Sequence, residues 1–433
     1  MKYTESEVLS YVSENDVKFI KLTFCDLFGR TKNISITSDK LPETFAKGLA
    51  FDAAEIDGFS DADDSDMILM PDPSTLCLLP WRPDRGRVVR MFCDIFHADG
   101  RAYVNDSRRI LKKAIDDTKD LGYRFIFGPE CEFYLFKTDA DGNPLHTPHD
   151  RAGYLDTSPK DKGENLRRDI CFTLEEMSLT PQCSHHEAGP GQHEIGFKPT
   201  SALDAADNIL TYFMTAKAIA ARNGLYASFM PHPIPDETGN GFHINISLYD
   251  KLKNVFYSDD GSLSPQAEAF SAGILDRVCD MTAFFNQTAN SYERLALEGM
   301  PKYVSWSFNN RSNLIRIPKA RPENARVELR SPDALCNPYI AFALLIYAGA
   351  DGIKRGLTLP ECSKATDAHT SRTGFTRLPE NLREALAAAS ESDFLREHLP
   401  SETLDSFLRM KRLECDAYDA SSDKPEFEYK RYF

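Results

Sequence analysis

The stretch FIFGPECEFYLF, residues 125–136, places two acidic side chains in an otherwise apolar segment. Successive side chains of a β-strand point to opposite faces of the sheet. Glu130 and Glu132 therefore lie on one face, and Cys131 and Phe133 lie on the other. Two carboxylates on so apolar a strand are costly unless cations pair with them. The stretch predicts a strand with a buried apolar face and a polar site on the opposite face.

Three further segments combine an apolar face with polar side chains: SHHEAGPGQHEIGF (184–197), GNGFHINISLY (239–249) and ARVELRS (325–331). In the first, the turn signal GPG predicts that Glu187 and Glu194 flank a tight loop. In the second, alternation puts His243 opposite the apolar face, and in the third it does the same for Glu328. The four segments are expected to be strands.

If these strands share a sheet, one of its faces carries five carboxylates and an imidazole: Glu130, Glu132, Glu187, Glu194, Glu328 and His243. Such a set suits two hard divalent cations, Mg²⁺ or Mn²⁺. The chain has neither HExxH nor paired cysteines, which argues against a zinc hydrolase. The nearby Arg311, Arg316 and Arg330 can hold phosphate through bidentate contacts. Together these groups favour phosphoryl transfer.

Other interpretations fit the same residues. A two-metal phosphohydrolase would need a similar set of carboxylates. A single Glu on a strand is also typical of a solvated edge. His243 alone would fit a structural histidine, and Arg316 and Arg330 would fit surface ion pairs. The absence of GxxxxGK[ST] argues against a P-loop nucleotide site.

The composition is that of a globular protein: 433 residues, 42% hydrophobic, with a net charge of 51 − 66 = −15. This length favours two domains, with three possible. The acidic excess argues against nucleic acid or an anionic membrane as a partner, and the basic stretch Arg82–Arg90 is interpreted as a solvated strand edge. No signal peptide or membrane-length apolar run is visible, and the ten cysteines are isolated. We expect a reduced, soluble, cytoplasmic protein.

Local patterns predict strands and short helices before residue 100 and a mixture of strands and long helices after it. A helix is expected from Thr4 to Glu14, strands at 17–30 and 88–96, and a loop at 51–73. Capping and turn signals predict the longer helices: 107–122, 201–224, 265–285, 338–356 and helices in the last fifty or so residues. A domain boundary is expected near residues 98–106.

Five motifs in collinear order carry a resemblance to a known family: GPECEFYLF, HHEAGPGQHEIGF, NGFHINISL, NRSNLIRIP and RVELRSPDALCNPYIAFALL. With FDAAEIDGF and YLDTSPKDKGENLRRDI, they resemble the glutamine synthetases, specifically the shorter bacterial type I form, over nearly the whole chain. The resemblance implies an α+β fold: a small β-grasp domain, residues 1–100, and a catalytic domain, residues 101–433, with a curved antiparallel sheet and flanking helices. It also implies a dodecamer of two stacked rings with active sites between subunits.

The resemblance further implies an ATP-dependent ligase that phosphorylates the γ-carboxylate of glutamate, after which ammonia displaces phosphate. Two to three Mg²⁺ or Mn²⁺ ions per site are implied, one held by Glu132, Glu187 and Glu194 and another by Glu130, His243 and Glu328. Its other assignments are Arg294, Arg330 and Gly239 for glutamate or the phosphoryl group, Arg311 and Arg316 for ATP phosphates, and Asn245 and Ser247 near the nucleotide.

The amine site departs from the family pattern. Asp52, serving the neighbouring subunit's site, Tyr154 and Glu187 match the family, but Glu55 stands where it has a serine. The flap segment LALEGMPKY, residues 295–303, is one residue shorter and lacks the family's glutamate, for which Glu298 is the candidate substitute. That glutamate excludes water and accepts a proton from ammonium. The departures leave two substrates open, ammonia and a primary amine or polyamine, and a regulatory homologue as a third reading.

Regulation by the family's known routes is not expected. The segment GFTRLPENL has no tyrosine for adenylylation, and the feedback arginine of shorter members is replaced by Asp61 or a neighbour.

Overall fold

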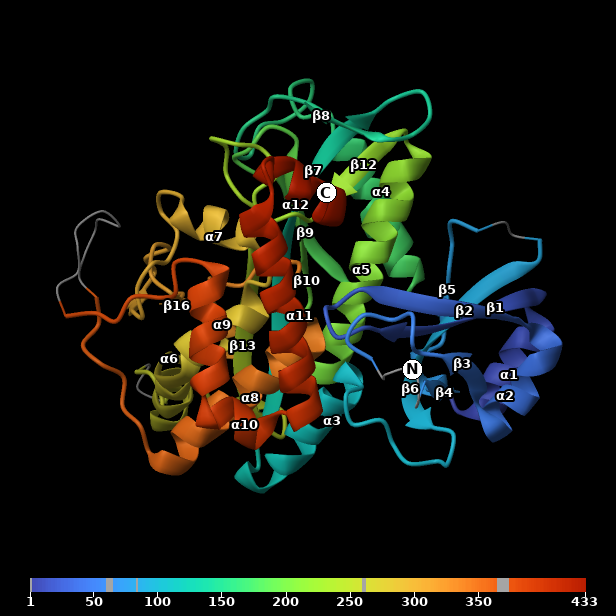
Figure 1. Ribbon diagram of the computed structural model, residues 1–433, viewed down its shortest axis with the longest axis horizontal. Helices are drawn as coiled ribbons and strands as arrows, with labels where there is room; N and C mark the ends of the chain where they lie inside the picture. The colour runs from blue at the N-terminus through green and yellow to red at the C-terminus, as the bar shows by residue number, and fades with distance from the viewer. Residues whose placement is uncertain (1, 60–64, 83–84, 259–261, 364–373) are drawn as a thin grey trace.

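The computed structural model describes residues 2–59, 65–82, 85–258, 262–363 and 374–433. Two sheets organise them (Figure 1). A small N-terminal sheet, blue on the right, encloses its own apolar core around Ile20, Leu69 and Met91. A larger sheet with its helices forms the rest of the chain and a second, more extensive core. The expected α+β organisation is confirmed.

The N-terminal sheet has the strand order β2-β1-β6-β4-β3, with β5 paired to β6. Its strands are β1 Val17–Cys25, β2 Thr31–Thr37, β3 Leu49–Asp52, β4 Asp66–Pro71, β5 Cys77–Leu78 and β6 Arg87–His97. Two helices accompany them, α1 Glu5–Glu14 and α2 Leu41–Lys47. The predicted first helix is confirmed with its capping box, in which Thr4 and Glu7 bind each other's backbone amides.

Two expectations about this sheet are wrong. The strand β6 is interior, because it pairs with β1 in parallel and with β4 antiparallel, so Arg90 is buried rather than at a solvated edge. Its guanidinium donates to Thr211 Oγ1 at 2.7 Å, across the junction between the two parts of the chain. The segment expected as a loop also ends in β4, in which Met67 and Leu69 alternate into the core.

The larger sheet is built around β7, the 15-residue strand Arg124–Thr138. The order β15-β16-β17-β13-β7-β10-β9 includes the four predicted strand segments, and β8, β11 and β12 also pair with β7. The strands are β8 Pro144–Pro148, β9 Pro181–His186, β10 Gln192–Phe197, β11 Thr200–Ser201, β12 Leu225–Ser228, β13 Phe242–Asp250, β14 Lys253–Asn254, β15 Trp306–Phe308, β16 Ile315–Ile317 and β17 Val327–Leu329.

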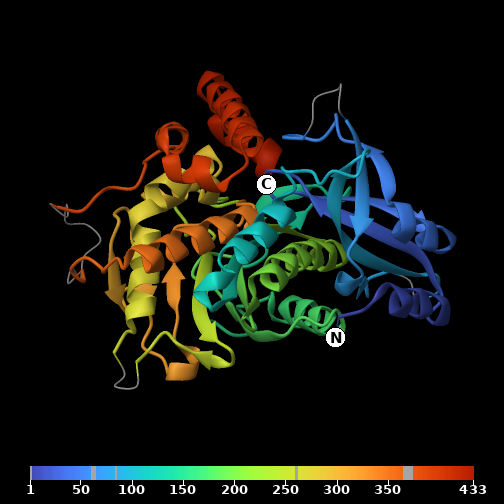
Figure 2. The same cartoon turned by 90° about the horizontal axis from the view of Figure 1, so that it is seen from below.

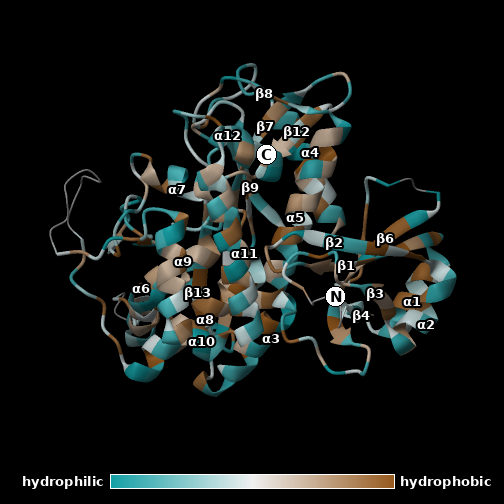
Figure 3. Ribbon diagram, viewed as in Figure 1, coloured by the Kyte–Doolittle hydropathy of each residue, from teal (hydrophilic) through white to brown (hydrophobic). Residues whose placement is uncertain are grey.

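Helices cover this sheet (Figure 2), and those predicted from the sequence are confirmed. They are α3 Ser107–Asp117, α4 Glu164–Glu176, α5 Ala202–Arg222, α6 Pro265–Phe285, α7 Ala289–Ala296, α8 Pro338–Arg355, α9 Leu382–Glu391, α10 Asp393–His398, α11 Ser401–Ala420 and α12 Lys424–Tyr432. The apolar α8, brown over most of its length in Figure 3, crosses α6 closely. A Cβ on Gly273 would lie 2.1 Å from the Ala348 carbonyl oxygen, so the crossing requires glycine.

Charged and polar contacts join the two parts of the chain. The buried Arg108 binds Asp72 and Asp94 of the N-terminal sheet and Asp207 of α5, at 2.9, 3.0 and 3.0 Å. The Asn337 side chain donates to the Asp26 carbonyl at 3.1 Å. Within the described ranges, no helix combines the length and apolarity needed to cross a bilayer.

Candidate active site

The strand register brings the predicted polar side chains into one row. His243 on β13 faces Glu130 on β7, and Glu194 on β10 faces Glu132 on β7. Glu328 on β17 lies between Asn245 of β13 and Arg316 of β16. The polar row therefore follows from pairing of strands whose apolar faces are turned to the core.

One of the two predicted ligand sets is assembled as expected. Oxygen and nitrogen atoms of Glu130, His243 and Glu328 lie within 4.8 Å of one another. The other set is divided between two groups, and in each group the ligand atoms also lie within 4.8 Å of one another. These are Glu132, Glu194 and His243, and His185, Glu187 and Glu194. Glu194 links the two, and His185 is a member that the sequence analysis missed.

The electrostatics of the row fit divalent cations. Burial, followed by repulsion from Glu132 and the other carboxylates, raises the pKa of Glu194 to about 9. Burial and then Glu187 raise the pKa of Glu132 to about 7. Burial and nearby arginines hold the pKa of His243 well below its ordinary value, which leaves a neutral imidazole suited to ligation. Oxygen donors that repel one another beside a neutral imidazole fit Mg²⁺ or Mn²⁺.

Glu132 is held by groups that the sequence analysis did not single out. Its Oε2 accepts hydrogen bonds from the Gly241 amide at 2.8 Å and from Gln192 Nε2 at 3.0 Å. Thr238 Oγ1 donates to Gln192 Oε1 at 2.7 Å, which fixes the orientation of the amide. Thr238 is thus part of the support for this carboxylate.

Two of the three predicted phosphate-binding arginines flank Glu328. Arg316 and Arg330 both form ion pairs with its buried carboxylate. Arg330 Nε also donates to the Arg311 carbonyl at 2.8 Å. Ion pairing was one of the alternatives for Arg316 and Arg330, but the pairs lie inside the polar row rather than on the surface.

The predicted glutamate-binding residues adjoin this row. Arg294 is buried and donates through Nη1 to the Ser331 and Pro332 carbonyls at 2.8 and 3.1 Å. Gly239 lies against it, because a Cβ there would be 2.7 Å from Arg294 Cγ. The same Cβ would be 2.6 Å from the Pro231 carbonyl oxygen, so only glycine fits.

A cavity of about 540 Å³ opens beside Glu130 and is lined by Asn245, Ser247 and Arg326. Asn245 donates to Glu130 Oε1 at 3.0 Å and accepts from Arg326 Nε at 2.8 Å. Ser247 donates to the Ala325 carbonyl at 2.8 Å. The two residues predicted near a nucleotide therefore line a cavity that adjoins the polar row, together with an arginine that the sequence analysis missed.

The predicted amine-site residues are only partly brought together. Glu187 Oε1 accepts a hydrogen bond from His185 Nε2 at 2.7 Å, and the exposed Tyr154 packs edge-on against the His185 ring. Asp52 and Glu55 instead lie at the end of β3, at the edge of the N-terminal sheet. Asp52 accepts from the Ala54 amide at 2.9 Å, which, with Ser65, lowers the pKa of its carboxyl.

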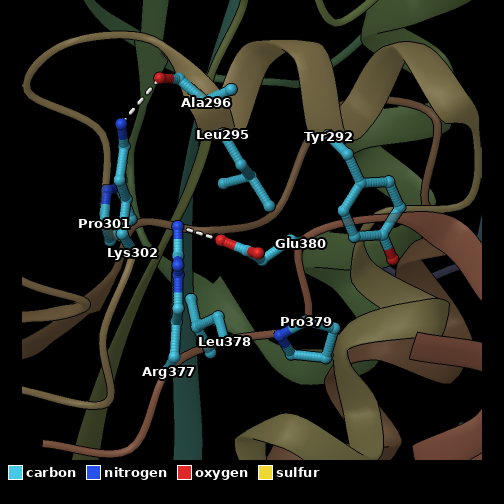
Figure 4. A pocket seen from close by; sticks show the side chains of 9 residues that line it. All are labelled: Tyr292, Leu295, Ala296, Pro301, Lys302, Arg377, Leu378, Pro379 and Glu380. Atoms are coloured by element: carbon cyan, nitrogen blue, oxygen red, sulfur yellow. Dashed lines mark hydrogen bonds and ion pairs between the residues drawn. The ribbon is translucent and has the colours of Figure 1, made fainter. Parts of the chain in front are cut away.

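The two ends of the flap are hydrogen-bonded to each other, and its C-terminal end is hydrogen-bonded to the segment at Leu378 (Figure 4). Lys302 Nζ donates to the Ala296 carbonyl at 2.7 Å, and the Leu378 amide donates to the Lys302 carbonyl at 3.0 Å. Arg377 pairs with Glu380 at the wall of a small cavity of about 90 Å³ behind the flap. Glu298 is exposed within the flap, and Asp61 lies outside the described residues.

Comparison with known proteins identifies the family. Residues 16–98 match the family described as "Glutamine synthetase, beta-Grasp domain", and residues 104–432 match "Glutamine synthetase, catalytic domain". The chain belongs to the glutamine synthetase family. The expected β-grasp domain and helix-flanked catalytic sheet are thereby confirmed.

Relatives within the glutamine synthetase family match along nearly the whole chain. The glutamine synthetase of Clostridium saccharobutylicum is 43% identical over 426 residues, covering 96% of each chain. That of Methanosarcina mazei is 42% identical, covering 96% of this chain and 95% of its own. Among solved structures, apo GmaS is 28% identical with a TM-score of 0.88, and the match covers 98% of this chain and 99% of the GmaS chain. The Plasmodium falciparum glutamine synthetase is 26% identical with a TM-score of 0.87, and the match covers 100% of this chain and 99% of the Plasmodium chain.

Proposed function

We propose that this protein is a glutamine synthetase, which ligates ammonia to the γ-carboxylate of glutamate at the expense of ATP. The observation that carries the proposal is the polar row, in which Glu130, Glu132, Glu194, Glu328 and His243 face one another across paired strands. The relatives at 38–43% identity named glutamine synthetase support the same activity.

The row would hold two to three Mg²⁺ or Mn²⁺ ions. When bound, such ions would neutralise the negative charge of the phosphates. Glu130, His243 and Glu328 would hold one ion, consistent with their mutual distances. Glu132, Glu187 and Glu194 would hold another, with Glu194 as the shared neighbour. The neutral state of His243 is the state that a ligand needs.

Phosphoryl transfer would occur beside Glu328. The γ-carboxylate oxygen of glutamate attacks the γ-phosphorus of ATP, ADP leaves, and γ-glutamyl phosphate forms. Arg311 and Arg316 would stabilise the ATP phosphates, and the cavity lined by Asn245 and Ser247 would take the rest of the nucleotide. Arg294, Arg330 and the Gly239 backbone would position glutamate or the phosphoryl group. Ammonia then attacks the acyl carbon of γ-glutamyl phosphate (Cδ of the glutamate), the C–N bond of the amide forms, a proton is lost from the nitrogen, and phosphate leaves with the acyl oxygen that it carried.

The amine would bind where Tyr154 and Glu187 meet. Asp52, whose pKa is lowered by the Ala54 amide and then by Ser65, would be the carboxylate that attracts ammonium. In one chain Asp52 lies in the N-terminal sheet and the polar row in the larger sheet. We therefore infer a homo-oligomer in which Asp52 completes a neighbouring subunit's site, with the family's dodecamer as the assembly. We further propose domains at 1–100 and 101–433, and the cytoplasm as the location.

A primary amine or polyamine is the second candidate for the amine substrate. Two observations favour it: Glu55 stands in the segment of Asp52 where the family has serine, and the flap at 295–303 lacks the family's glutamate. Both changes are at the amine side, whereas the predicted ligands and arginines are all present.

The test is phosphate release by the purified protein with ATP, Mg²⁺ and glutamate, challenged with ammonia, methylamine, ethanolamine and putrescine in parallel. We expect release with ammonia at ordinary concentrations. Release only with the larger amines would establish the second candidate. Release with none of them would identify a regulatory homologue, and both candidates would be rejected.

A further inference from the structure

A second cavity, of about 430 Å³, lies at the junction of the N-terminal sheet with the larger part of the chain. Its walls include Arg30, from the turn between β1 and β2, Lys217 on α5 and Lys411 on α11. Aromatic rings complete the walls, among them Phe229 and Tyr432. The cavity shares no lining residue with the one beside Glu130, so it is separate from the candidate active site.

The three cations around this junction cavity differ in how they are paired. Lys411 is buried and donates to Glu414 Oε2 at 2.9 Å, and Arg30 lies 3.7 Å from Asp57. Lys217 forms no ion pair with a described residue, and its ammonium instead lies 5.7 Å from the centroid of the Phe229 ring. Lys217 is therefore a cation of this cavity that no described carboxylate neutralises by direct contact.

These cations also repel one another. Burial lowers the pKa of Lys411, Glu414 opposes this, and Arg30 lowers it further. Desolvation by the surrounding protein, and then Arg30, lower the pKa of Lys217, whose side chain keeps part of its surface exposed. An anion between them would reduce this repulsion.

Aromatic rings complete the setting for a ligand. Phe213, Phe229 and Tyr432 line the same cavity as the three cations. They would cover an apolar body attached to an anion that the cations bind.

We propose that this junction cavity is a binding site for a small organic anion, a carboxylate or phosphate carried on an apolar or aromatic body. Arg30, Lys217 and Lys411 bind the anionic group, and Phe229 and Tyr432 pack against the body. This inference does not rest on the proposed function, because none of these side chains belongs to the polar row.

The test is isothermal titration calorimetry of the full-length protein with phenyl phosphate, benzoate and benzyl alcohol, in saturating Mg²⁺ and ADP. We expect one anion to bind per chain and the neutral alcohol not to bind. Binding of phenyl phosphate alone would identify a phosphate ligand. Binding of both anions would show that a negative charge on an aromatic body is sufficient for binding. Failure of both anions to bind, or equal binding of the alcohol, would overturn the proposal.

Variants locate the binding. Lys217→Met keeps the length of the side chain and removes its charge, and we expect it to weaken anion binding about tenfold or more. Arg30→Gln removes a charge from the opposite wall of the cavity, and it provides the same test if Lys217→Met does not fold. Lys47→Met, an equivalent change on exposed α2, should leave the affinity unchanged. Anion binding that is unaltered in both Lys217→Met and Arg30→Gln would place the anion elsewhere and refute the site.

Discussion

Gln192 donates from its side-chain amide to Glu132 at 3.0 Å, and both residues stand on neighbouring strands of the larger sheet. The amide cannot turn over, because Thr238 and the Gly189 backbone both donate to its oxygen, at 2.7 and 3.0 Å. A carboxylate with a raised pKa is thus given a fixed donor that favours its charged form.

Gln192→Leu should weaken binding of the divalent cation by about 10- to 100-fold, because loss of a support for a ligand has effects of this size. The measurement is the Mn²⁺ dissociation constant, from electron paramagnetic resonance of free Mn²⁺. Thr238→Val should act in the same direction but less strongly, since it removes only one of the contacts that orient the amide. Equal Mn²⁺ affinity in wild type and Gln192→Leu would show that Glu132 does not ligate the ion.

Glu328→Gln should reduce ATP turnover by about 10²-fold or more, because it removes a proposed ligand and the common partner of Arg316 and Arg330. Turnover is measured as phosphate release at saturating glutamate. Circular dichroism and gel filtration check that the chain is folded and assembled. Glu164→Gln, on the exposed first turn of α4, is the matched control and should retain normal turnover. Near-normal turnover in Glu328→Gln would exclude the assignment of this carboxylate.

Asp150→Asn should destabilise the protein by about 3–5 kcal/mol, the cost of breaking a buried charged pair. Asp150 Oδ1 accepts from His186 Nε2 at 2.9 Å and from the Gly191 amide at 3.0 Å, and Oδ2 accepts from the Lys162 amide at 2.9 Å. Urea unfolding measures the loss, with Asp141→Asn in an exposed turn as control. Because His186 and Gly191 border the loop of Glu187, Mn²⁺ affinity should fall as well. A stability equal to the control would contradict the role given to Asp150.

Glu428 makes stability depend on pH. Burial, followed by Glu414, raises the pKa of this α12 carboxyl from 4.5 to about 7. The folded state thus holds the proton of this carboxyl more tightly than the unfolded state does. The stability of the folded state is therefore highest at low pH and falls as the pH rises from 4.5 through about 7. Glu428→Gln should remove that loss, which is on the order of 3 kcal/mol at most above pH 7.

Melting temperatures of wild type and Glu428→Gln between pH 5 and 8.5 test this dependence. The difference should be small at pH 5 and reach its full size above pH 7, with the variant more stable. Glu426→Gln, at an exposed site of the same helix, should show no such pH dependence. A constant difference across the range would mean that Glu428 does not titrate between these limits.

Much of the candidate site follows from local pattern. Alternation along 125–136 assigned Glu130 and Glu132 to one face, and the same rule placed His243 and Glu328, because each strand has a continuous apolar side to bury. The same rule also contained a signal for His185 and Gln192, which precede Glu187 and Glu194 by two residues and so share their faces.

Other features depend on contacts between distant segments. Nothing near Arg90 indicates that β6 is interior, since this depends on its pairing with two other segments of the chain, β1 and β4. Local pattern alone therefore predicts an exposed basic stretch. The junction cavity likewise joins residues 30, 217 and 411, whose proximity no local spacing reports. The position of Asp52 relative to Tyr154 depends on how subunits meet, which no strand pattern encodes.

The length and central place of β7 set how far this protein can be altered. Its residues pair with β8, β10, β11, β12 and β13 in fixed registers. One residue inserted between Gly128 and Glu132 would turn the side chains beyond it to the opposite face and shift them against several partners at once. Insertions of peptide tags or fused modules should therefore fail along this strand. The exposed turn at 139–143 at its end is the place where they should succeed.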